Sequence, residues 1–303
     1  MELMGCEGLR EATLGCGVVL LCATDTEAAP VRAALHAPRH HTVATKTVYV
    51  GELAAAGESA PPVKVCLAIS GCDKANAAHL LTCLLQAITP GPRLVLQIGI
   101  GGAFPSAGPG PGAGLGDIVI ATQEIYSDTG SSSPERWYSA AELGLPIAKV
   151  NGVEVGGSFS LDVGLALAAT DVIQTLEWSV ADPGSVLATP ENATWSTGVG
   201  RPGGNPAVLL GTCLTASRVT GLRGQAEQAA ARWGALAESM EGAAAAHVCA
   251  LYQMPFLEIR GISNLVVDRD RASWRVERAV AIAGRAALAV AAAIDGLPLG
   301  KNG

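Results

Sequence analysis

The chain has 303 residues, of which 49% are hydrophobic and 16% charged, and its formal net charge is -7. Enough apolar residues are present to fill a deep core, which excludes a disordered protein. The negative charge and the scarcity of Lys and Arg clusters argue against nucleic-acid partners, because proteins that bind nucleic acids need a basic surface. We therefore expect a globular protein that binds a small molecule.

The eight cysteines lie mostly within apolar runs and form no CxxC pair. This pattern is typical of reduced, buried thiols in the cytoplasm. Two apolar segments could be mistaken for membrane elements. Residues 16–23 follow acidic residues rather than a cationic region, and residues 279–294 fall short of the ~20 residues that a membrane span requires. We interpret them as a first strand and a terminal helix, and we expect no membrane partner.

Apolar runs rich in β-branched residues alternate with helical segments, which is typical of an α/β domain built on a largely parallel sheet. The predicted strands are 17–23, 42–50, 63–70, 94–98, 117–125, 207–214 and 256–262. The predicted helices are 27–36, 74–88, 161–178, 224–235, 241–253 and 274–294. In open α/β sheets, ligands bind at the carboxyl ends of the strands, so functional residues are expected there.

Two segments are predicted to be loops. The stretch 105–116 is rich in Gly and Pro, and 182–206 has the composition of a loop insertion. Neither separates two halves of different composition, as a domain linker would. We therefore predict an N-terminal extension over 1–15 and one domain over 16–298.

Two carboxylates, Asp25 and Glu27, follow the first predicted strand. One interpretation is structural, with Asp25 or Thr26 capping the next helix and Glu27 favoured by the helix dipole. The other is functional, with Glu27 as a general base. The segment itself does not decide between them.

A glycine-rich run from Gly99 to Gly102 follows the strand predicted at 94–98. Position 104 is Phe and no Gly-Lys-Ser/Thr sequence follows, which argues against a dinucleotide fingerprint and a phosphate-binding loop. Glycines here allow a ligand to approach the backbone closely, although a plain structural turn remains open. No cofactor is predicted.

The stretch from Glu238 to Trp274 is the most informative. It contains Met240-Glu241-Gly at a helix start, and then a strand ending in Arg260-Gly-Ile-Ser-Asn264. This pair of motifs resembles the nucleosidase branch of the purine nucleoside phosphorylase superfamily. The resemblance implies a three-layer α/β/α fold with a central mixed, largely parallel sheet, and an enzyme that acts on a nucleoside.

The resemblance also implies roles for individual residues. In this family the acid after Met holds the ribose hydroxyls, so Glu241 is the expected ribose anchor and Met240 its apolar floor. Glu27 occupies the place of the carboxylate that activates water. The other substrate-binding residues that we predict are Ile100, Gly101, Gly102, Arg218, Val219, Ser263 and Trp274.

Hydrolysis is favoured over phosphorolysis. Relatives that use phosphate resemble one another in a Gly-Asp-Pro-x-Arg turn after the first strand, which this chain lacks. Asp25 and Glu27 lie there instead, and two carboxylates repel a phosphate dianion.

Asn264 indicates the kind of purine. Nucleosidases that act on adenine nucleosides resemble this chain but have Asp there. An amide supplies an NH₂ donor, which suits the O6 and N7 acceptors of a 6-oxopurine. Hypoxanthine is therefore the expected base, and Asn264 is predicted to assist its departure by hydrogen bonding.

The segment 260–274 as a whole resembles the futalosine hydrolases, which release hypoxanthine from futalosine on a route to menaquinone. Futalosine bears a carboxyphenyl ketone, for which Trp274 and Arg269 or Arg271 are suitable partners. The two arginines are equally well explained as part of a solvated charge run with neighbouring aspartates.

Other candidates are declined or stay open. His247 is expected to be a packed side chain, His36, His40 and His41 to be surface residues, and no cluster has metal-ligand spacing. A nucleosidase for methylthioadenosine, S-adenosylhomocysteine or inosine, and a nucleoside-binding protein without activity, remain alternatives. The resemblance also implies a homodimer or larger homo-oligomer.

Overall fold

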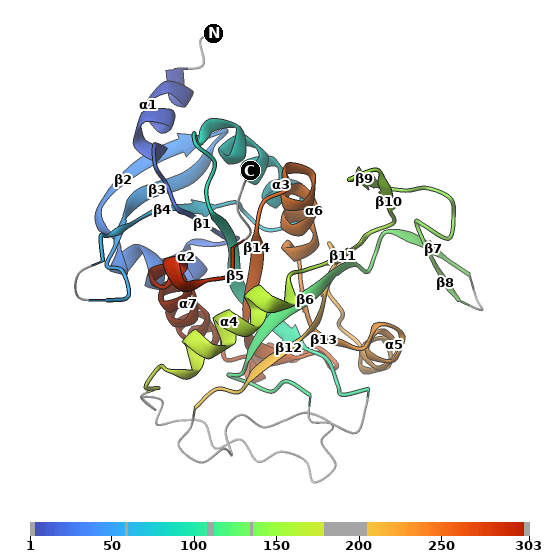
Figure 1. Cartoon of the computed structure of the whole chain (residues 1–303). Helices are drawn as coiled ribbons and strands as arrows, with labels where there is room; N and C mark the ends of the chain where they lie inside the picture. Colours follow the sequence, from blue (N-terminus) through green and yellow to red (C-terminus); the bar gives the residue numbers. More distant parts are fainter. Residues whose placement is uncertain (1–3, 58–59, 108–111, 134–135, 179–204, 300–303) are drawn as a thin grey trace.

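A 10-stranded mixed sheet forms the centre of the molecule (Figure 1). The computed structural model describes residues 4–57, 60–107, 112–133, 136–178 and 205–299. Within these residues the strand order is β11-β6-β12-β13-β5-β1-β4-β3-β2, and β14 pairs with both β5 and β6. The strands of this sheet are β1 Val18–Cys22, β2 His36–Val43, β3 Lys46–Leu53, β4 Val63–Ile69, β5 Leu94–Ala103, β6 Ile118–Tyr126, β11 Ser158–Ser160, β12 Val208–Thr215, β13 Ala235–Ser239 and β14 Phe256–Leu265.

Five strands of the sheet close into a ring. β6 pairs with β12, β12 with β13 and β13 with β5, while β14 joins β5 on one side to β6 on the other. The pairs β12–β13 and β5–β14 are parallel, and β13–β5 is antiparallel. This closure brings the last residues of β5 beside both β13 and β14.

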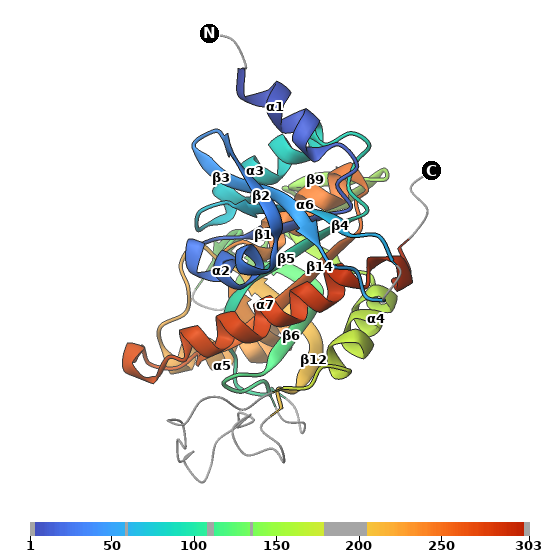
Figure 2. The same cartoon turned by 90° about the vertical axis from the view of Figure 1, so that its left-hand side faces the viewer.

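Helices cover both faces of the sheet, which gives the predicted three layers (Figure 2). All five residues of β1 are buried. Val18 and Leu20 belong to the apolar cluster that includes residues of α2, α4 and α7, whereas Val19 and Leu21 belong to the one that includes residues of α1, α3 and α6. A strand buried on both faces is expected to be a continuous apolar run, as β1 is. The helices are α1 Met4–Thr13, α2 Asp25–Ala34, α3 Lys74–Ala87, α4 Val163–Gln174, α5 Arg223–Trp233, α6 Gly242–Tyr252 and α7 Val276–Ala292, with 3-10 turns η2 Arg271–Ser273 and η3 Ile294–Gly296.

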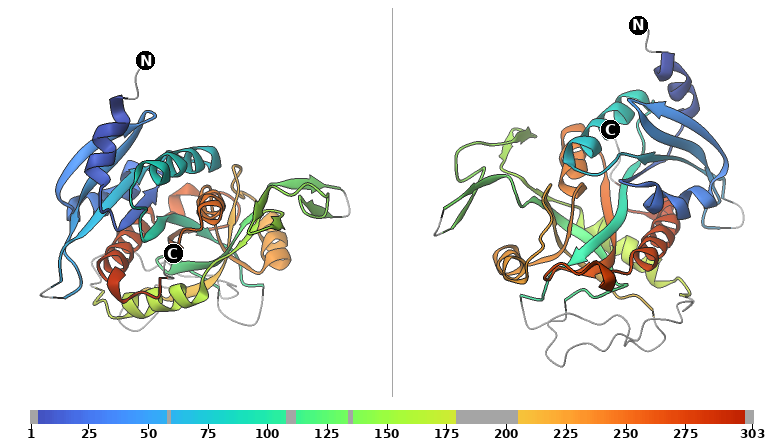
Figure 3. Two further views of the ribbon diagram at one scale, coloured as in Figure 1. Left: turned by 45° about the horizontal axis from the view of Figure 1, so that its top comes forward. Right: turned by 180° about the vertical axis from the view of Figure 1, so that it is seen from behind.

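Two short hairpins project from the body in both views of Figure 3. One pairs β7 Gly130–Ser132 with β8 Trp137–Ser139, and the other pairs β9 Ala148–Val150 with β10 Val153–Val155. These strands were not predicted. Each has three residues, most of them at least partly exposed, so no hydrophobic alternation marks them in the sequence.

The prediction of a single strand over 42–50 is corrected, because these residues belong to the end of β2 and the start of β3. The chain reverses at Ala44 and Thr45, which have φ values of 46° and 68°, and forms the antiparallel pair β2–β3. β2 has mostly exposed residues and contains three histidines, an arginine and a proline, a composition with little strand signal. β13 was also missed, because its sequence Ala-Leu-Ala-Glu-Ser has a composition like that of the helix α5 before it. In the structure, Gly234 ends α5 in the left-handed region, and β13 begins at the next residue.

Part of the predicted N-terminal extension packs on the body. Leu9 and Ala12 of α1 are each 1% exposed and join the apolar cluster with α3 and α6. The predicted insertion at 182–206 lies outside the described residues except for its last two positions. In the described part of the chain, no helix is both long and apolar enough to cross a bilayer.

Candidate active site

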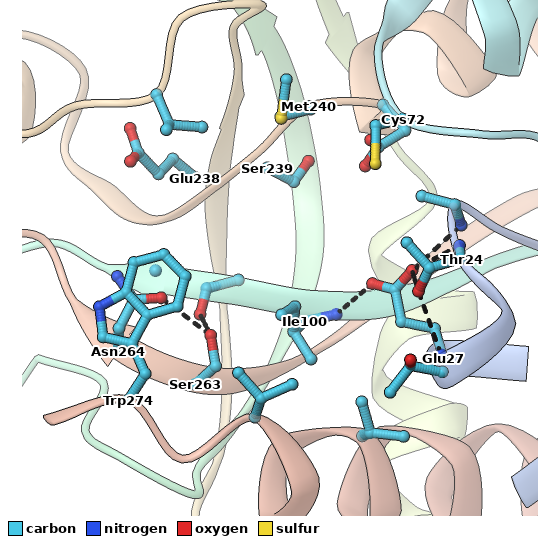
Figure 4. Close-up of a pocket in the computed structure, with 18 of the residues that line it drawn as sticks. Thr24, Glu27, Cys72, Ile100, Glu238, Ser239, Met240, Ser263, Asn264 and Trp274 are labelled. Carbon is cyan, nitrogen blue, oxygen red and sulfur yellow. Dashed lines mark hydrogen bonds between the residues drawn. The ribbon is translucent and has the colours of Figure 1, made fainter. Parts of the chain in front are cut away.

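A cavity of about 300 Å³ opens at the carboxyl ends of β1, β5 and β14 (Figure 4). All but one of the predicted site residues line it: Glu27, Ile100, Gly101, Gly102, Val219, Met240, Glu241, Ser263, Asn264 and Trp274. The exception is Arg218, which lines a neighbouring cavity with Arg232 and Trp233. The loop after β12 presents Val219 and Thr220 to both cavities. The contact of Arg218 with a substrate therefore stays a prediction, for a residue beside the first cavity and not in its wall.

Glu27 is both a capping residue and a cavity residue. The residue that caps α2 is Thr24, rather than Asp25 or Thr26 as predicted, and it forms a reciprocal capping box with Glu27. One carboxylate oxygen of Glu27 accepts hydrogen bonds from the N–H groups of Ala23 and Thr24 and from the Thr24 hydroxyl, at 2.9 to 3.2 Å. The other oxygen accepts the N–H of Ile100 at 2.9 Å. These bonds fix the carboxylate at one end of the cavity.

Glu27 and Arg260 approach each other across Gly99. A Cβ atom at Gly99 would lie 2.6 Å from Nη1 of Arg260 and would also clash with Oε1 of Glu27. Any side chain at this position would therefore displace one of the two groups. The requirement for Gly99 comes from the approach of these side chains and not from an unusual backbone conformation.

Glu241 precedes α6 and is 4% exposed. One of its oxygens accepts the N–H of Asp73 at 3.1 Å, and the other lies 3.6 Å from Nη1 of Arg260. Asp73 has a φ of 85°, and this turn directs its N–H to Glu241. Burial raises the pKa of Glu241, while Arg260 and the Asp73 N–H act in the opposite direction.

Arg260 lies beneath the cavity and is 1% exposed. Its Nε donates to Glu258 at 2.6 Å, and Nη1 donates to the carbonyl of Ile100 at 3.4 Å. Burial alone would lower the pKa of Arg260, but Glu258, Glu241 and Glu27 raise it above its ordinary value. The guanidinium therefore stays charged and holds these carboxylates around it.

Glu258 also contacts Glu124, which is fully buried. Burial and the charge of Glu258 raise the pKa of Glu124 well above its ordinary value. The hydroxyl of Thr215 donates to Glu124 at 2.7 Å and accepts the N–H of Ala243. This network links Arg260 to the start of α6, which directly follows Glu241, the predicted ribose-binding acid.

Asn264 and Ser263 lie at the end of the cavity away from Glu27 (Figure 4). The Ser263 hydroxyl donates to Oδ1 of Asn264 at 2.8 Å, and Nδ2 donates to the carbonyl of Leu265 at 3.3 Å. An amide nitrogen carries two hydrogens, so one N–H is available to a ligand. Its position is fixed by neighbours in the same strand.

Glu238 lines the cavity but belongs to none of the predicted site motifs. It is 7% exposed, and its two oxygens accept the N–H of Thr220 at 3.0 and 3.2 Å. Burial raises its pKa to about 7, against the effect of the Thr220 hydrogen bonds. It lies two residues before Met240, in β13. Because β13 was not predicted as a strand, the sequence did not indicate that the Glu238 side chain faces the cavity.

The raised pKa of Glu238 predicts a pH-dependent stability. The folded protein holds this proton more tightly than the unfolded chain, so the contribution of Glu238 to the unfolding free energy falls as the pH rises from about 4.5 to 7. Gln does not titrate. From pH 5 to pH 8, Glu238→Gln should gain about 2 to 3 kcal/mol in unfolding free energy relative to the original protein, measured with urea. If the unfolding free energies of the variant and the original protein differ by the same amount at pH 5 and pH 8, the prediction is contradicted.

Trp274 forms a wall of the cavity together with Arg269. The guanidinium carbon of Arg269 lies 5.1 Å from the centre of the Trp274 ring, and that of Arg271 lies 5.9 Å from it. Arg271 does not line this cavity. Of the two predicted cations, Arg269 is thus the one that a ligand can reach.

His247 lies away from the cavity. It is half-buried, its ring stacks on Phe159 with a centroid distance of 5.1 Å, and it contacts Tyr126. Burial lowers its pKa. It is a packed side chain, as predicted.

The family model for the Phosphorylase superfamily matches residues 18–297. The chain belongs to this superfamily. It is 30% identical over 189 residues to futalosine hydrolase of Streptomyces coelicolor, a match that covers 62% of this chain and 60% of that relative. It is 29% identical over 217 residues to futalosine hydrolase of Thermus thermophilus, covering 72% and 76% of the two chains. The predicted family is confirmed.

Nucleosidases of a second specificity are also similar. The chain is 29% identical over 248 residues to 5'-methylthioadenosine/S-adenosylhomocysteine nucleosidase of Mycobacterium bovis, covering 82% and 85% of the two chains. The futalosine hydrolase structure from Helicobacter pylori matches with a TM-score of 0.68 at 15% identity, covering 93% and 99%. The nucleosidase from Neisseria meningitidis matches with a TM-score of 0.67 at 21% identity, covering 91% and 98%. These structural matches confirm the predicted fold.

Proposed function

We propose that this protein hydrolyses the N-glycosidic bond of futalosine and releases hypoxanthine and dehypoxanthine futalosine, a step towards menaquinone. One observation carries the proposal: Glu27, Glu241 and Asn264, far apart in the sequence, line the same cavity. Its volume of about 300 Å³ is at the lower end of the usual range for small-molecule sites. The resemblance to curated futalosine hydrolases supports the choice of substrate.

In the proposed mechanism, Glu27 accepts a proton from the water that attacks the anomeric carbon. Glu241 accepts hydrogen bonds from the ribose hydroxyls, which stabilise the sugar as it gains positive charge, and Met240 contacts the sugar. Asn264 donates to the departing purine. Arg260 keeps Glu241 in place through the contact at 3.6 Å.

Electrostatics favour water over phosphate as the nucleophile. The cationic group nearest the sugar end, Arg260, is already surrounded by Glu27, Glu241 and Glu258. A phosphate dianion placed there would be repelled by Glu27 and Glu241, whereas a neutral water is not. We propose a hydrolase that needs no metal or cofactor and acts in the cytoplasm as a homo-oligomer.

The direct test is to incubate the protein with futalosine in phosphate-free buffer and to measure free hypoxanthine by chromatography. We expect hypoxanthine to accumulate at a rate that added phosphate does not increase. A requirement for phosphate would exclude hydrolysis, and intact futalosine would exclude this substrate.

A nucleosidase for adenine-containing substrates is the second candidate. The mycobacterial relatives favour it, because their similarity extends over 82% of this chain. Methylthioadenosine and S-adenosylhomocysteine, assayed beside futalosine for adenine release, separate the two functions. Asn264 favours the 6-oxopurine, since the remaining N–H of its amide can donate to O6 or N7.

Asn264→Ala tests the role of the amide. Loss of a donor to a developing anion should lower kcat with the purine substrate by ~10²- to 10³-fold. The expected loss is in kcat more than in thermal stability, because Asn264 is only partly buried. Unchanged turnover in a folded variant would remove Asn264 from the mechanism.

A further inference from the structure

Glu238 and Asn264 lie on either side of Gly102. In the closed ring of strands, Gly102 of β5 is paired with Glu238 of β13 and with Asn264 of β14. A Cβ atom at Gly102 would lie 3.0 Å from Nδ2 of Asn264. Figure 4 shows Glu238, Asn264 and Trp274 at one end of the cavity, opposite Glu27. The end expected to hold the base therefore has a carboxylate as well as an amide.

The two common purine types differ in the hydrogen-bonding groups at N1 and C6, which such a carboxylate would contact. A 6-oxopurine has acceptors at N7 and O6 and a donor at N1–H, whereas a 6-aminopurine has an amino donor at C6 and an acceptor at N1. An ionised carboxylate only accepts hydrogen bonds, and an amide nitrogen only donates. Asn264 and Glu238 together therefore match N7 or O6, and N1–H, of the 6-oxo form.

We propose that Glu238 is a specificity-determining residue, which accepts the N1–H of a 6-oxopurine while Asn264 donates to its N7 and O6 edge. This inference rests on the proposed function and extends it, since it assigns the discrimination against adenine to a residue outside the family motifs considered above. The N1 lone pair of an adenine would instead face the carboxylate oxygens.

The contacts of Glu238 suit this role. The Thr220 N–H holds its carboxylate from one side, and a carboxylate has about four acceptor positions, so others are left for a ligand. Because the group is 7% exposed, a mismatched base cannot be compensated by bulk water. Among the residues that the structure describes, the other ionisable groups lining the cavity are Glu27, Glu241, Cys72 and Arg269.

Titration of Glu238 provides a second signature. Its pKa is raised to about 7, so the acceptor form predominates above that pH and the protonated, donor form below it. The preference for hypoxanthine over adenine should therefore increase from pH 6 to pH 8. The same measurement on Glu238→Gln should give a preference that varies less with pH.

The first test changes only the ligand. Binding of hypoxanthine, 1-methylhypoxanthine and adenine to the unmodified protein is measured by calorimetry at pH 8. The methylated base keeps O6 and N7 but has no N1–H, and it should bind roughly 10- to 100-fold more weakly than hypoxanthine. Equal binding of the two oxopurines would overturn the proposal without any substitution in the protein.

The second test changes the residue. In Glu238→Ala, which leaves room for the methyl group, the two oxopurines should bind within about threefold of each other, because neither finds an acceptor. In Glu238→Gln, the amide can donate to N1 of adenine, so the ratio of hypoxanthine to adenine affinity should fall about tenfold or more. A tenfold difference between the oxopurines that persists in Glu238→Ala would show that a steric effect causes it, and would overturn the proposal.

Glu227→Gln is the matched control, because Glu227 is exposed on α5 and outside the cavity. We expect it to bind all three bases like the original protein. Failure of the proposed function is separately visible. A protein that releases a purine from nucleosides but lacks these Glu238 effects contradicts only the inference, whereas one that binds no purine and hydrolyses no nucleoside contradicts both.

Discussion

Glu27→Gln is expected to slow hydrolysis of the nucleoside by ~10²- to 10⁴-fold, because an amide cannot take a proton from the attacking water. The rate of hypoxanthine release measures this loss. The carboxylate of Glu27 also accepts N–H groups on both of its oxygens. In the variant an amide N–H must face one of these donors, so we also expect a loss of about 1–2 kcal/mol in unfolding free energy.

Asp25→Asn is the control for this experiment. Asp25 lies in the first turn of the same helix, and its side chain is 77% exposed. Its neutralisation removes one negative charge near the cavity without removing a group that touches the expected water, so the rate should stay close to that of the original protein. A folded Glu27→Gln variant with full activity would exclude Glu27 as the base.

Arg260→Met is expected to be the most destabilising single change at the site. The substitution roughly keeps the length of the side chain but leaves Glu258 and Glu241 without their cation in a buried environment. Removing one partner of a buried ion pair costs about 3–5 kcal/mol, more than pairing gains at a surface. Urea unfolding at pH 7 measures the loss directly.

Arg93→Met is the matched surface substitution. Arg93 pairs with Asp295, but its side chain is 47% exposed, so the change should cost less than about 1 kcal/mol. A similar, small loss for Arg260→Met would mean that the buried carboxylates take up protons without cost. The account of Arg260 as the centre of the cluster would then be wrong.

The sequence alone determined most of the repeating elements. β1, β4 and the helices α3, α6 and α7 were predicted to within a few residues, because long apolar runs and their polar boundaries depend on neighbours in the chain. The single strand predicted over 42–50 joined the end of β2 to the start of β3. The edge strand β2 is exposed and polar, so it is recognised only by its pairing with β3.

The sequence also determined much of the candidate site. Glu27, Glu241 and Asn264 were predicted from motifs, and each lies at the end of a strand or the start of a helix, where a local signal exists. All three line the cavity, although their roles stay proposals. Arg218 was selected by its position along the chain, and the loop after β12 places it in the wall of the adjoining cavity instead.

Only the tertiary structure decided which groups surround these residues. The ring formed by β6, β12, β13, β5 and β14 is what places Glu238 beside Asn264, and the approach of Glu27 to Arg260 depends on the pairing of β5 with β14. Pairing between strands distant in sequence has no local pattern, because it is set by the burial of whole faces. The burial of Glu238 also comes from this pairing of distant strands. It raises the pKa of Glu238 to about 7, which no property of its sequence neighbours predicts.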